Sequence, residues 1–290
     1  MATQFESTTP GMTYPRSVEE AVTDLQQEGA IPVGGGTWVM RAPLRHERRA
    51  DRLVALHRIE GFTRLEVVQD GISIGPLATH DRLSRDLPDR TGFNVLREAA
   101  SRAANPGVRR IATIGGNIAT SAFAASDFAP ALLSLDARVT IADRTGRQDL
   151  SMEEFLAGRA AFERPWLVTG IVVPSRERRT AHERLPMRRA GDYPCAIVSV
   201  SAGIDDAGLI RDVRIGIGAV EAVARRWHGL EQALIGRRAA ESEQAARDLI
   251  TDFSGRDAAD APGWYRTSVL PALVRRAFTT IEASRSGSCT

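Results

Sequence analysis

The chain carries at residues 112–119 the run Ala-Thr-Ile-Gly-Gly-Asn-Ile-Ala, a glycine-rich turn that leads into a helical pattern. A second cluster, Val-Gly-Gly-Gly-Thr at residues 33–37, follows a short apolar run. Such turns suit phosphate groups, because the backbone can approach the anion closely and free N–H groups point at it. Neither cluster is the Gly-x-Gly-x-x-Gly fingerprint of a doubly wound sheet. We expect either two turns that clamp the halves of a pyrophosphate, or two tight turns without a ligand.

Outward from these clusters, residues 1–175 mix short apolar runs with helical patterns. Ser17 and Ser151 each open a Ser-x-x-Glu capping box, which predicts a helix start. The pair Asp70-Gly71 between two apolar runs predicts a β-hairpin, and residues 105–107 (Asn-Pro-Gly) predict a break. This part of the chain is therefore expected to be α+β.

The pattern changes after about residue 175. Two apolar-rich strands are expected at residues 196–204 and 209–217, and helices at about 229–235, 240–253 and 263–283. The Arg-rich stretch 176–189 is expected to form a solvated or partner-facing surface, with an anion site as the alternative. Gly216 and Gly218 lie inside a strand pattern, so we interpret them as structural, at a close approach of two backbones.

Composition excludes several classes of function. The chain has 290 residues, 43% hydrophobic and 26% charged, as in ordinary globular proteins. The 38 basic residues are all Arg, which excludes mechanisms that need a lysine amine. A net charge of +2 gives little general attraction to nucleic acid. We find no Gly-x-Ser-x-Gly, His-Glu-x-x-His or Cys–His signature, so no catalytic residue is predicted in this chain.

The cysteine and histidine content argues against a metal. The two cysteines, Cys195 and Cys289, cannot form a four-thiolate cluster, and the five histidines are scattered. Reduced thiols, no apolar run of 18 residues and no leader pattern at the N-terminus favour a cytoplasmic protein without membrane insertion.

At the glycine clusters the chain resembles a known family, the FAD-binding medium subunits of molybdenum hydroxylases. This group contains carbon monoxide dehydrogenase, nicotine dehydrogenase-type enzymes and the flavin domain of xanthine dehydrogenase. Four stretches keep the family's order: residues 33–37 (Ala-Gly-Gly-Thr/His in the family), 74–80 (Ile-Gly-Ala-x-x-Thr-His), 112–119 (Ala-Thr-Ile-Gly-Gly-Asn-Ile-Ala) and 189–193 (Arg-x-x-Asp-Tyr/Ile). The third is the most specific.

The resemblance implies an α+β fold of the vanillyl-alcohol-oxidase (PCMH) type. Two subdomains, residues 1–56 and 57–176, would hold FAD between them. A small α+β C-terminal domain, an antiparallel sheet with helices, would follow over residues 177–290. The change of pattern near residue 175 agrees with that last boundary.

The resemblance also implies the cofactor site. Residues 33–37 and 113–117 would offer backbone donors to the FAD pyrophosphate, Asp127 would hold polar FAD atoms, and Leu167 or Val168 would pack near a ring. The full expected set is Pro32, Val33, Gly34, Gly35, Gly36, Thr37, Trp38, Ala103, Ala104, Thr113, Gly115, Gly116, Asn117, Thr120, Ser126, Asp127, Leu167, Val168, Arg188 and Tyr193.

Three departures from the family pattern leave alternatives open. Trp38 replaces a small polar residue, and either packs on the cofactor or fills the core. The loop after Asn117 is one residue longer than usual, so Ser126 is an alternative to Asp127, both in the site and as the cap of the helix that follows. A family Lys before the fourth motif is absent, and either Arg184 or Arg188 stands in for it.

The function implied by the resemblance is electron transfer. The flavin subunit would take electrons from two [2Fe–2S] clusters of a small partner subunit, while a large molybdopterin subunit oxidises the substrate. The assembly would be a dimer of heterotrimers, and an external acceptor would receive the electrons. The alternatives are a free-standing flavin oxidoreductase and a flavin-free scaffold subunit.

Overall fold

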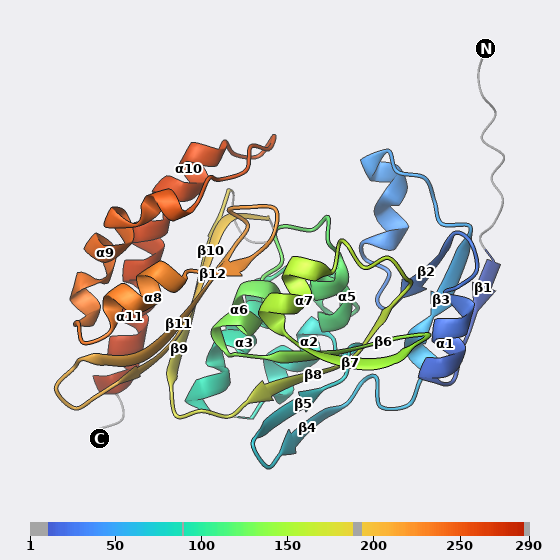
Figure 1. Cartoon of the computed structure of the whole chain (residues 1–290), viewed down its shortest axis with the longest axis horizontal. Coiled ribbons are helices and arrows are strands. Elements are labelled where there is room, and N and C mark those ends of the chain that lie inside the picture. Colours follow the sequence, from blue (N-terminus) through green and yellow to red (C-terminus); the bar gives the residue numbers. More distant parts are fainter. Residues whose placement is uncertain (1–10, 89, 188–192, 287–290) are drawn as a thin grey trace.

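Strand β8 (Leu167–Pro174) lies in the middle of a five-stranded sheet of order β4-β5-β8-β6-β7, the central sheet of the chain (Figure 1). The computed structural model describes residues 11–88, 90–187 and 193–286. Every neighbouring pair in the central sheet is antiparallel. Its other strands are β4 (Leu65–Val68), β5 (Gly71–Ile74), β6 (Arg138–Asp143) and β7 (Gly146–Ser151).

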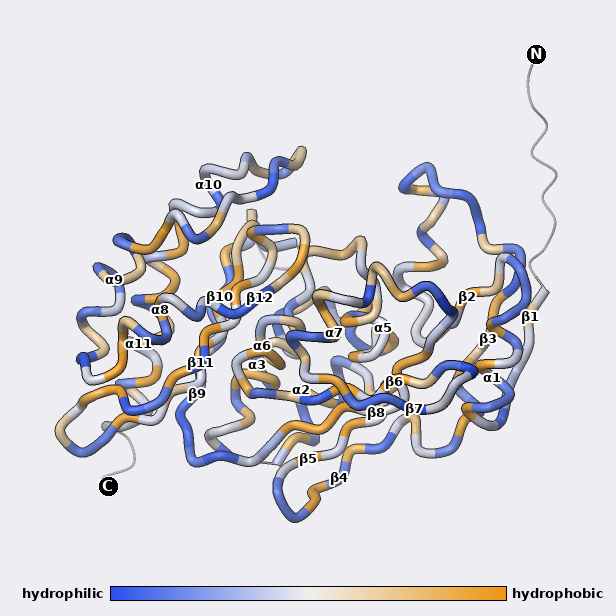
Figure 2. The backbone as a smooth tube through the Cα atoms, viewed as in Figure 1, coloured by the Kyte–Doolittle hydropathy of each residue, from blue (hydrophilic) through white to orange (hydrophobic). Residues whose placement is uncertain are grey.

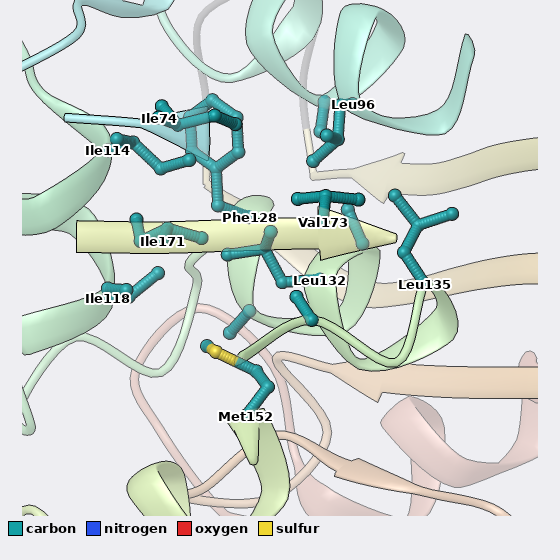
Figure 3. Packing of buried hydrophobic residues seen from close by; sticks show 14 of the residues in the cluster. Ile74, Leu96, Ile114, Ile118, Phe128, Leu132, Leu135, Met152, Ile171 and Val173 are labelled. Atoms are coloured by element: carbon teal, nitrogen blue, oxygen red, sulfur yellow. The ribbon is translucent and has the colours of Figure 1, made fainter. Parts of the chain in front are cut away.

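Helices cover one face of the central sheet and bury an apolar core there. They are α2 (His80–Asp86), η3 (Thr91–Phe93), α3 (Asn94–Arg102), α4 (Pro106–Arg109), α5 (Ile114–Ala119), α6 (Phe128–Ser134) and α7 (Met152–Gly158). Figure 3 shows Phe128 and Leu132 of α6 converging on Ile171 of β8. Apolar burial at this seam holds α6, and with it the loop before α6, in place.

A smaller parallel sheet precedes the central one. Its strands have the order β1-β3-β2 and comprise β1 (Gly11–Thr13), β2 (Ala30–Val33) and β3 (Arg52–Ala55), with α1 (Val18–Asp24), η1 (Val39–Arg45) and η2 (Leu56–Arg58) beside them. In Figure 2 the connection from η1 to β3 is mostly hydrophilic. Leu167 of β8 belongs to the apolar cluster of this sheet, so the two sheets share buried surface.

A four-stranded antiparallel sheet of order β12-β11-β10-β9 follows (Figure 1). Its strands are β9 (Arg179–Pro186), β10 (Pro194–Ile204), β11 (Ile210–Gly218) and β12 (Arg225–Arg226). The helices packed with it are α8 (His228–Leu234), η4 (Ala239–Glu241), α9 (Ser242–Asp248), η5 (Ile250–Asp252), α10 (Gly263–Ser268) and α11 (Leu270–Ser286).

The turn and helix-cap motifs in the sequence predicted several of the helix starts and turns of this fold. The hairpin at Asp70-Gly71 and the capping box at Ser151 are confirmed. Ser17 caps α1, but the carboxylate of Glu20 accepts from the N–H of Arg16 instead of closing the box. The predicted break at residues 105–107 is confirmed, because α3 ends at Arg102, and Asn105 then caps a new short helix, α4, that has proline in its first position.

The Arg-rich stretch is the main correction. We expected a solvated or partner-facing surface over residues 176–189, but residues 179–186 form β9, which pairs with β10 and contacts α3 and α11. Arg178 and Arg184 are each 6% exposed. Their charges meet carboxylates, Arg178 at the partly exposed Asp212 and Arg184 at the buried Asp127. The charge pattern along the sequence does not indicate such pairs, because the partners are far apart in the chain.

Candidate functional site

The two glycine clusters touch each other. A Cβ atom built on Gly35 would lie 1.7 Å from the backbone oxygen of Ile111, and one on Gly34 would lie 2.8 Å from Oγ1 of Thr113. Gly36 has a φ of 70°, a left-handed conformation that favours glycine. Residues 34–36 therefore need glycine for two reasons, and the clusters, about 80 residues apart in sequence, form one surface.

The first cluster presents unused hydrogen-bond donors. In the described part of the chain, the N–H groups of residues 34–38 donate to no acceptor. The hydroxyl of Thr37 likewise has no partner there. Buried or half-buried backbone groups are normally satisfied, so a run of free N–H groups on a glycine loop is suited to an anion.

The second cluster differs from our expectation. The N–H of Ile114 donates to Ala78 (3.0 Å), that of Gly115 to Pro76 (2.9 Å), and that of Asn117 to its own turn at Thr113 (2.9 Å). Oγ1 of Thr113 accepts the N–H of Gly116 at 3.3 Å. Of residues 113–117, only the N–H of Thr113 keeps no partner in the described chain, so this turn contributes shape more than donors.

Ser126, and not Asp127, caps helix α6. Its hydroxyl oxygen accepts the N–H of Ala129 at 3.0 Å, whereas the Asp127 side chain makes no cap bond. The Ser126 hydroxyl also donates to Oδ1 of Asn117, and the Thr120 hydroxyl donates to the backbone oxygen of Gly116 at 2.7 Å. The loop between the second cluster and α6 is thus tied to that cluster at both ends.

Asp127 is 1% exposed and lies in a buried polar group that joins the start of α6 to β9. Its Oδ1 is 3.2 Å from Nε2 of His182 and 3.0 Å from Nε of Arg184. Nδ1 of His182 is 2.9 Å from the hydroxyl of Ser199. Arg184 therefore balances the charge of Asp127 in this structure; the other candidate, Arg188, lies outside the described residues.

The other expected residues that the structure describes come from α3, the loop after it, β2 and β8. Ala103 ends α3 and the oxygen of Ala104 accepts from Arg109. Pro32 is exposed on β2, next to Val33. Leu167 and Val168 are each 4% exposed. Leu167 belongs to the apolar cluster of the parallel sheet, and Val168 belongs to the apolar cluster between the central sheet and its helices.

Trp38 does not fill a core. It is half-buried and belongs to none of the three clusters of buried apolar residues. Its ring lies against Phe123, which in turn meets Tyr193, and the Arg45 guanidinium lies 3.9 Å from its centroid. Sequence analysis missed Phe123 and Arg45, because neither belongs to a motif.

His80 is a second residue that the sequence did not assign. It is 3% exposed, and within the described part of the chain neither ring nitrogen has a partner at hydrogen-bond geometry. Its ring meets Phe128 edge-on at 4.8 Å. Burial lowers the pKa of His80 to about 4, against a raising effect of nearby Asp127. The imidazole is therefore neutral at physiological pH.

Among the described residues no three His, Cys, Asp or Glu side chains gather as metal ligands. No helix among them has the length and apolarity needed to cross a bilayer.

The residues present fit a flavin dinucleotide. The free N–H groups of residues 34–38 suit a pyrophosphate, and the absence of side chains at Gly34 and Gly35 lets this loop lie directly against the second turn. Binding and orienting a redox cofactor is the chemistry that this arrangement of donors supports.

Comparison with known proteins agrees. Residues 4–176 match the family model "FAD binding domain in molybdopterin dehydrogenase", and residues 183–281 match "CO dehydrogenase flavoprotein C-terminal domain". The chain is 28% identical to the nicotine 6-hydroxylase medium subunit of Paenarthrobacter nicotinovorans, over 94% of this chain and 98% of that one. It is 27% identical to the carbon monoxide dehydrogenase medium chain of Hydrogenophaga pseudoflava, over 93% and 96%.

Solved structures support the same fold. A structure of Cu,Mo-CO dehydrogenase matches with a TM-score of 0.88 at 23% identity, covering 95% of this chain and 99% of that one. The expected α+β fold is thereby confirmed. The match of the FAD-binding model to more than half of the sequence places the chain in its family: it belongs to the FAD-binding medium subunits of molybdenum hydroxylases, and so to the FAD-dependent subunits of oxidoreductases.

Proposed function

We propose that this chain binds FAD between its first two sheets, with the pyrophosphate on residues 34–38 and against the turn at Thr113–Gly116. The observation that carries the proposal is the glycine loop whose N–H groups have no acceptor in the described chain, pressed against a second glycine turn. When bound, FAD supplies the one- and two-electron chemistry. The protein's residues bind it, orient it and exclude water.

The electron path is also a proposal. Two cysteines cannot ligate the clusters, so two [2Fe–2S] centres would lie in a small partner subunit and the molybdopterin cofactor in a large one. The names "medium subunit" and "medium chain" of the relatives support such partners. Electrons would pass from the clusters through this subunit to an external acceptor, in a cytoplasmic dimer of heterotrimers.

The domain limits that go with this function are residues 1–56 and 57–176 for FAD binding and 177–290 for the C-terminal domain. Each range contains one of the three sheets. The family-model boundaries near residues 176 and 183 support the last limit.

The first test is spectroscopic. The native complex, purified with its partner chains, should give flavin absorption bands with an iron–sulfur shoulder, and should release FAD on denaturation. Active single chains with FAD alone would favour a free-standing oxidoreductase. Folded protein without flavin would favour a scaffold and would refute the proposed site.

A substitution tests the pyrophosphate site. Gly116 is exposed, and a Cβ there would lie 3.0 Å from Oγ1 of Thr113. Gly116→Val should leave a folded protein that loses FAD, because a branched side chain occupies the surface where phosphate would lie. FAD released per protein molecule is the measurement.

The matched control is Gly203→Val in β10, where a Cβ would meet only atoms of Asp212 at 3.9 Å. That variant should keep its flavin. Full flavin occupancy in Gly116→Val would show that the pyrophosphate does not lie at this turn.

A further inference from the structure

Three aromatic side chains, Trp38, Phe123 and Tyr193, form a row beside the first glycine cluster. The ring centroids of Trp38 and Phe123 are 5.4 Å apart, and those of Phe123 and Tyr193 are 5.2 Å apart. None of the three belongs to a buried apolar cluster, and Tyr193 is 49% exposed. We call this set the aromatic row. Large rings that pack together outside a core leave surface available to a planar ligand.

The aromatic row draws on all three sheets. Trp38 lies between β2 and β3 of the parallel sheet, Phe123 lies between α5 and α6 on the central sheet, and Tyr193 precedes β10. The row therefore starts at the proposed phosphate loop and ends at the four-stranded sheet. A dinucleotide whose pyrophosphate lies on residues 34–38 would have the row within reach of one of its ring systems.

The indole of Trp38 is held in place before any ligand arrives. The Arg45 guanidinium lies 3.9 Å from the ring centroid, and its Nη1 donates to the backbone oxygen of Trp38 at 3.0 Å. Glu47 accepts from Nε and Nη2 of the same guanidinium at 2.8 and 2.6 Å. A ring fixed in this way loses little conformational entropy when a ligand stacks on it.

We propose that Trp38 is a stacking residue for the isoalloxazine ring of FAD, and that the aromatic row forms one wall of the flavin cleft. The inference rests on the proposed function. The row runs from the proposed phosphate loop toward the four-stranded sheet at Tyr193, and the comparison of ADP with FAD below separates isoalloxazine from adenine as the ring that it contacts. A neighbouring indole deactivates the excited state of a flavin, so contact has a signature apart from enzyme activity.

The test is Trp38→Leu in the full chain, assembled with its partner subunits, stripped of flavin and titrated with FAD. Dialysis measures affinity and emission measures the fluorescence of the bound flavin. We expect roughly tenfold weaker binding, in the range of ring stacking on aromatic side chains, and a several-fold rise in fluorescence per bound flavin. Trp38→Phe should keep affinity within about threefold and still raise the fluorescence, and it serves as the test if Trp38→Leu does not fold.

Trp264→Leu is the matched control, because Trp264 is 71% exposed and its ring contact is with Tyr265 of its own helix. It should change neither readout. Wild-type complex that binds no FAD would refute the proposed function. If wild type binds FAD, unchanged affinity and fluorescence in the Trp38 variants overturn the stacking role alone, even if stability falls. Equal weakening of ADP and FAD binding would move the contact to adenine and overturn the isoalloxazine assignment.

Discussion

His80 is a buried, uncharged imidazole whose ring packs against Phe128. No ring nitrogen of His80 has a partner at hydrogen-bond geometry among the described residues, and burial is the largest cause of its lowered pKa; Asp127 and the backbone of Thr113 act against that shift, and Arg109 acts with it. The folded protein therefore resists protonation at this residue down to about pH 4. The unfolded chain accepts that proton near pH 6.5, so the two states differ in bound protons between these values.

The consequence is acid sensitivity. The contribution of this residue to stability is fully present above pH 6.5. It falls as the pH drops toward 4, by at most about 3.5 kcal/mol, since each pKa unit corresponds to about 1.4 kcal/mol. In the His80→Leu variant the free energy of unfolding should depend less on pH between 7 and 4.5. Urea unfolding at pH 7 and 4.5 measures it, with exposed His57→Leu as control. An unchanged slope in His80→Leu would contradict the lowered pKa.

At the scale of elements, α6 rests directly on β11. A Cβ on Gly216 would lie 2.1 Å from the backbone oxygen of Pro130, and one on Gly218 would lie 2.8 Å from Cγ of the same proline. The structural interpretation of these two glycines is confirmed. The loop that contacts the second glycine cluster leads directly into α6. The close packing of α6 on β11 therefore also positions that loop.

Gly216→Ala should therefore destabilise the protein by about 2–3 kcal/mol, because neither backbone can yield without moving a packed element. The free energy of urea unfolding is the measurement. Gly203→Ala, where the added carbon meets atoms only at 3.9 Å, should cost under about 1 kcal/mol. Equal losses in the two variants would show that the contact with Pro130 is not the cause.

At the scale of the whole molecule, Asp136 joins the central and four-stranded sheets electrostatically. Its Oδ1 is 3.1 Å from Nε of Arg214 and 3.2 Å from Nη1 of Arg226. Its Oδ2 is 3.6 Å from Arg178 and 3.7 Å from Arg176. Because Arg178 is almost enclosed, removal of the carboxylate leaves buried positive charge less compensated.

Asp136→Asn should lower the free energy of unfolding by about 2 kcal/mol, below the range for fully buried pairs because Asp136 is 21% exposed. Asparagine tolerates the φ of 53° at this position, so the variant changes charge and not backbone. Glu66→Gln, which breaks an exposed pair with Arg64, should cost only a few tenths of a kcal/mol. If Asp136→Asn and wild type were equally stable, the ion pairs of Asp136 would make no net contribution to the free energy of unfolding.

Much of the candidate site was predictable because its signals are local. Glycines that admit a close backbone approach, and threonine at a helix start, are readable within a few residues, as at Gly35 and Thr113. The hairpin at residues 65–74 and the cap at Ser151 have the same origin. The family motifs add the order of these stretches along the chain, and hence the fold.

Contacts between distant residues required the tertiary structure. The burial of β9, the pairing of Asp127 with Arg184, and the engagement of the second turn's N–H groups all depend on partners from other elements. The aromatic row unites residues 38, 123 and 193, which no sequence period connects. The sequence alone determined the turns, the caps and the family, because these depend on neighbouring residues; the structure decided which charges are buried and which rings meet, because only packing brings distant segments together.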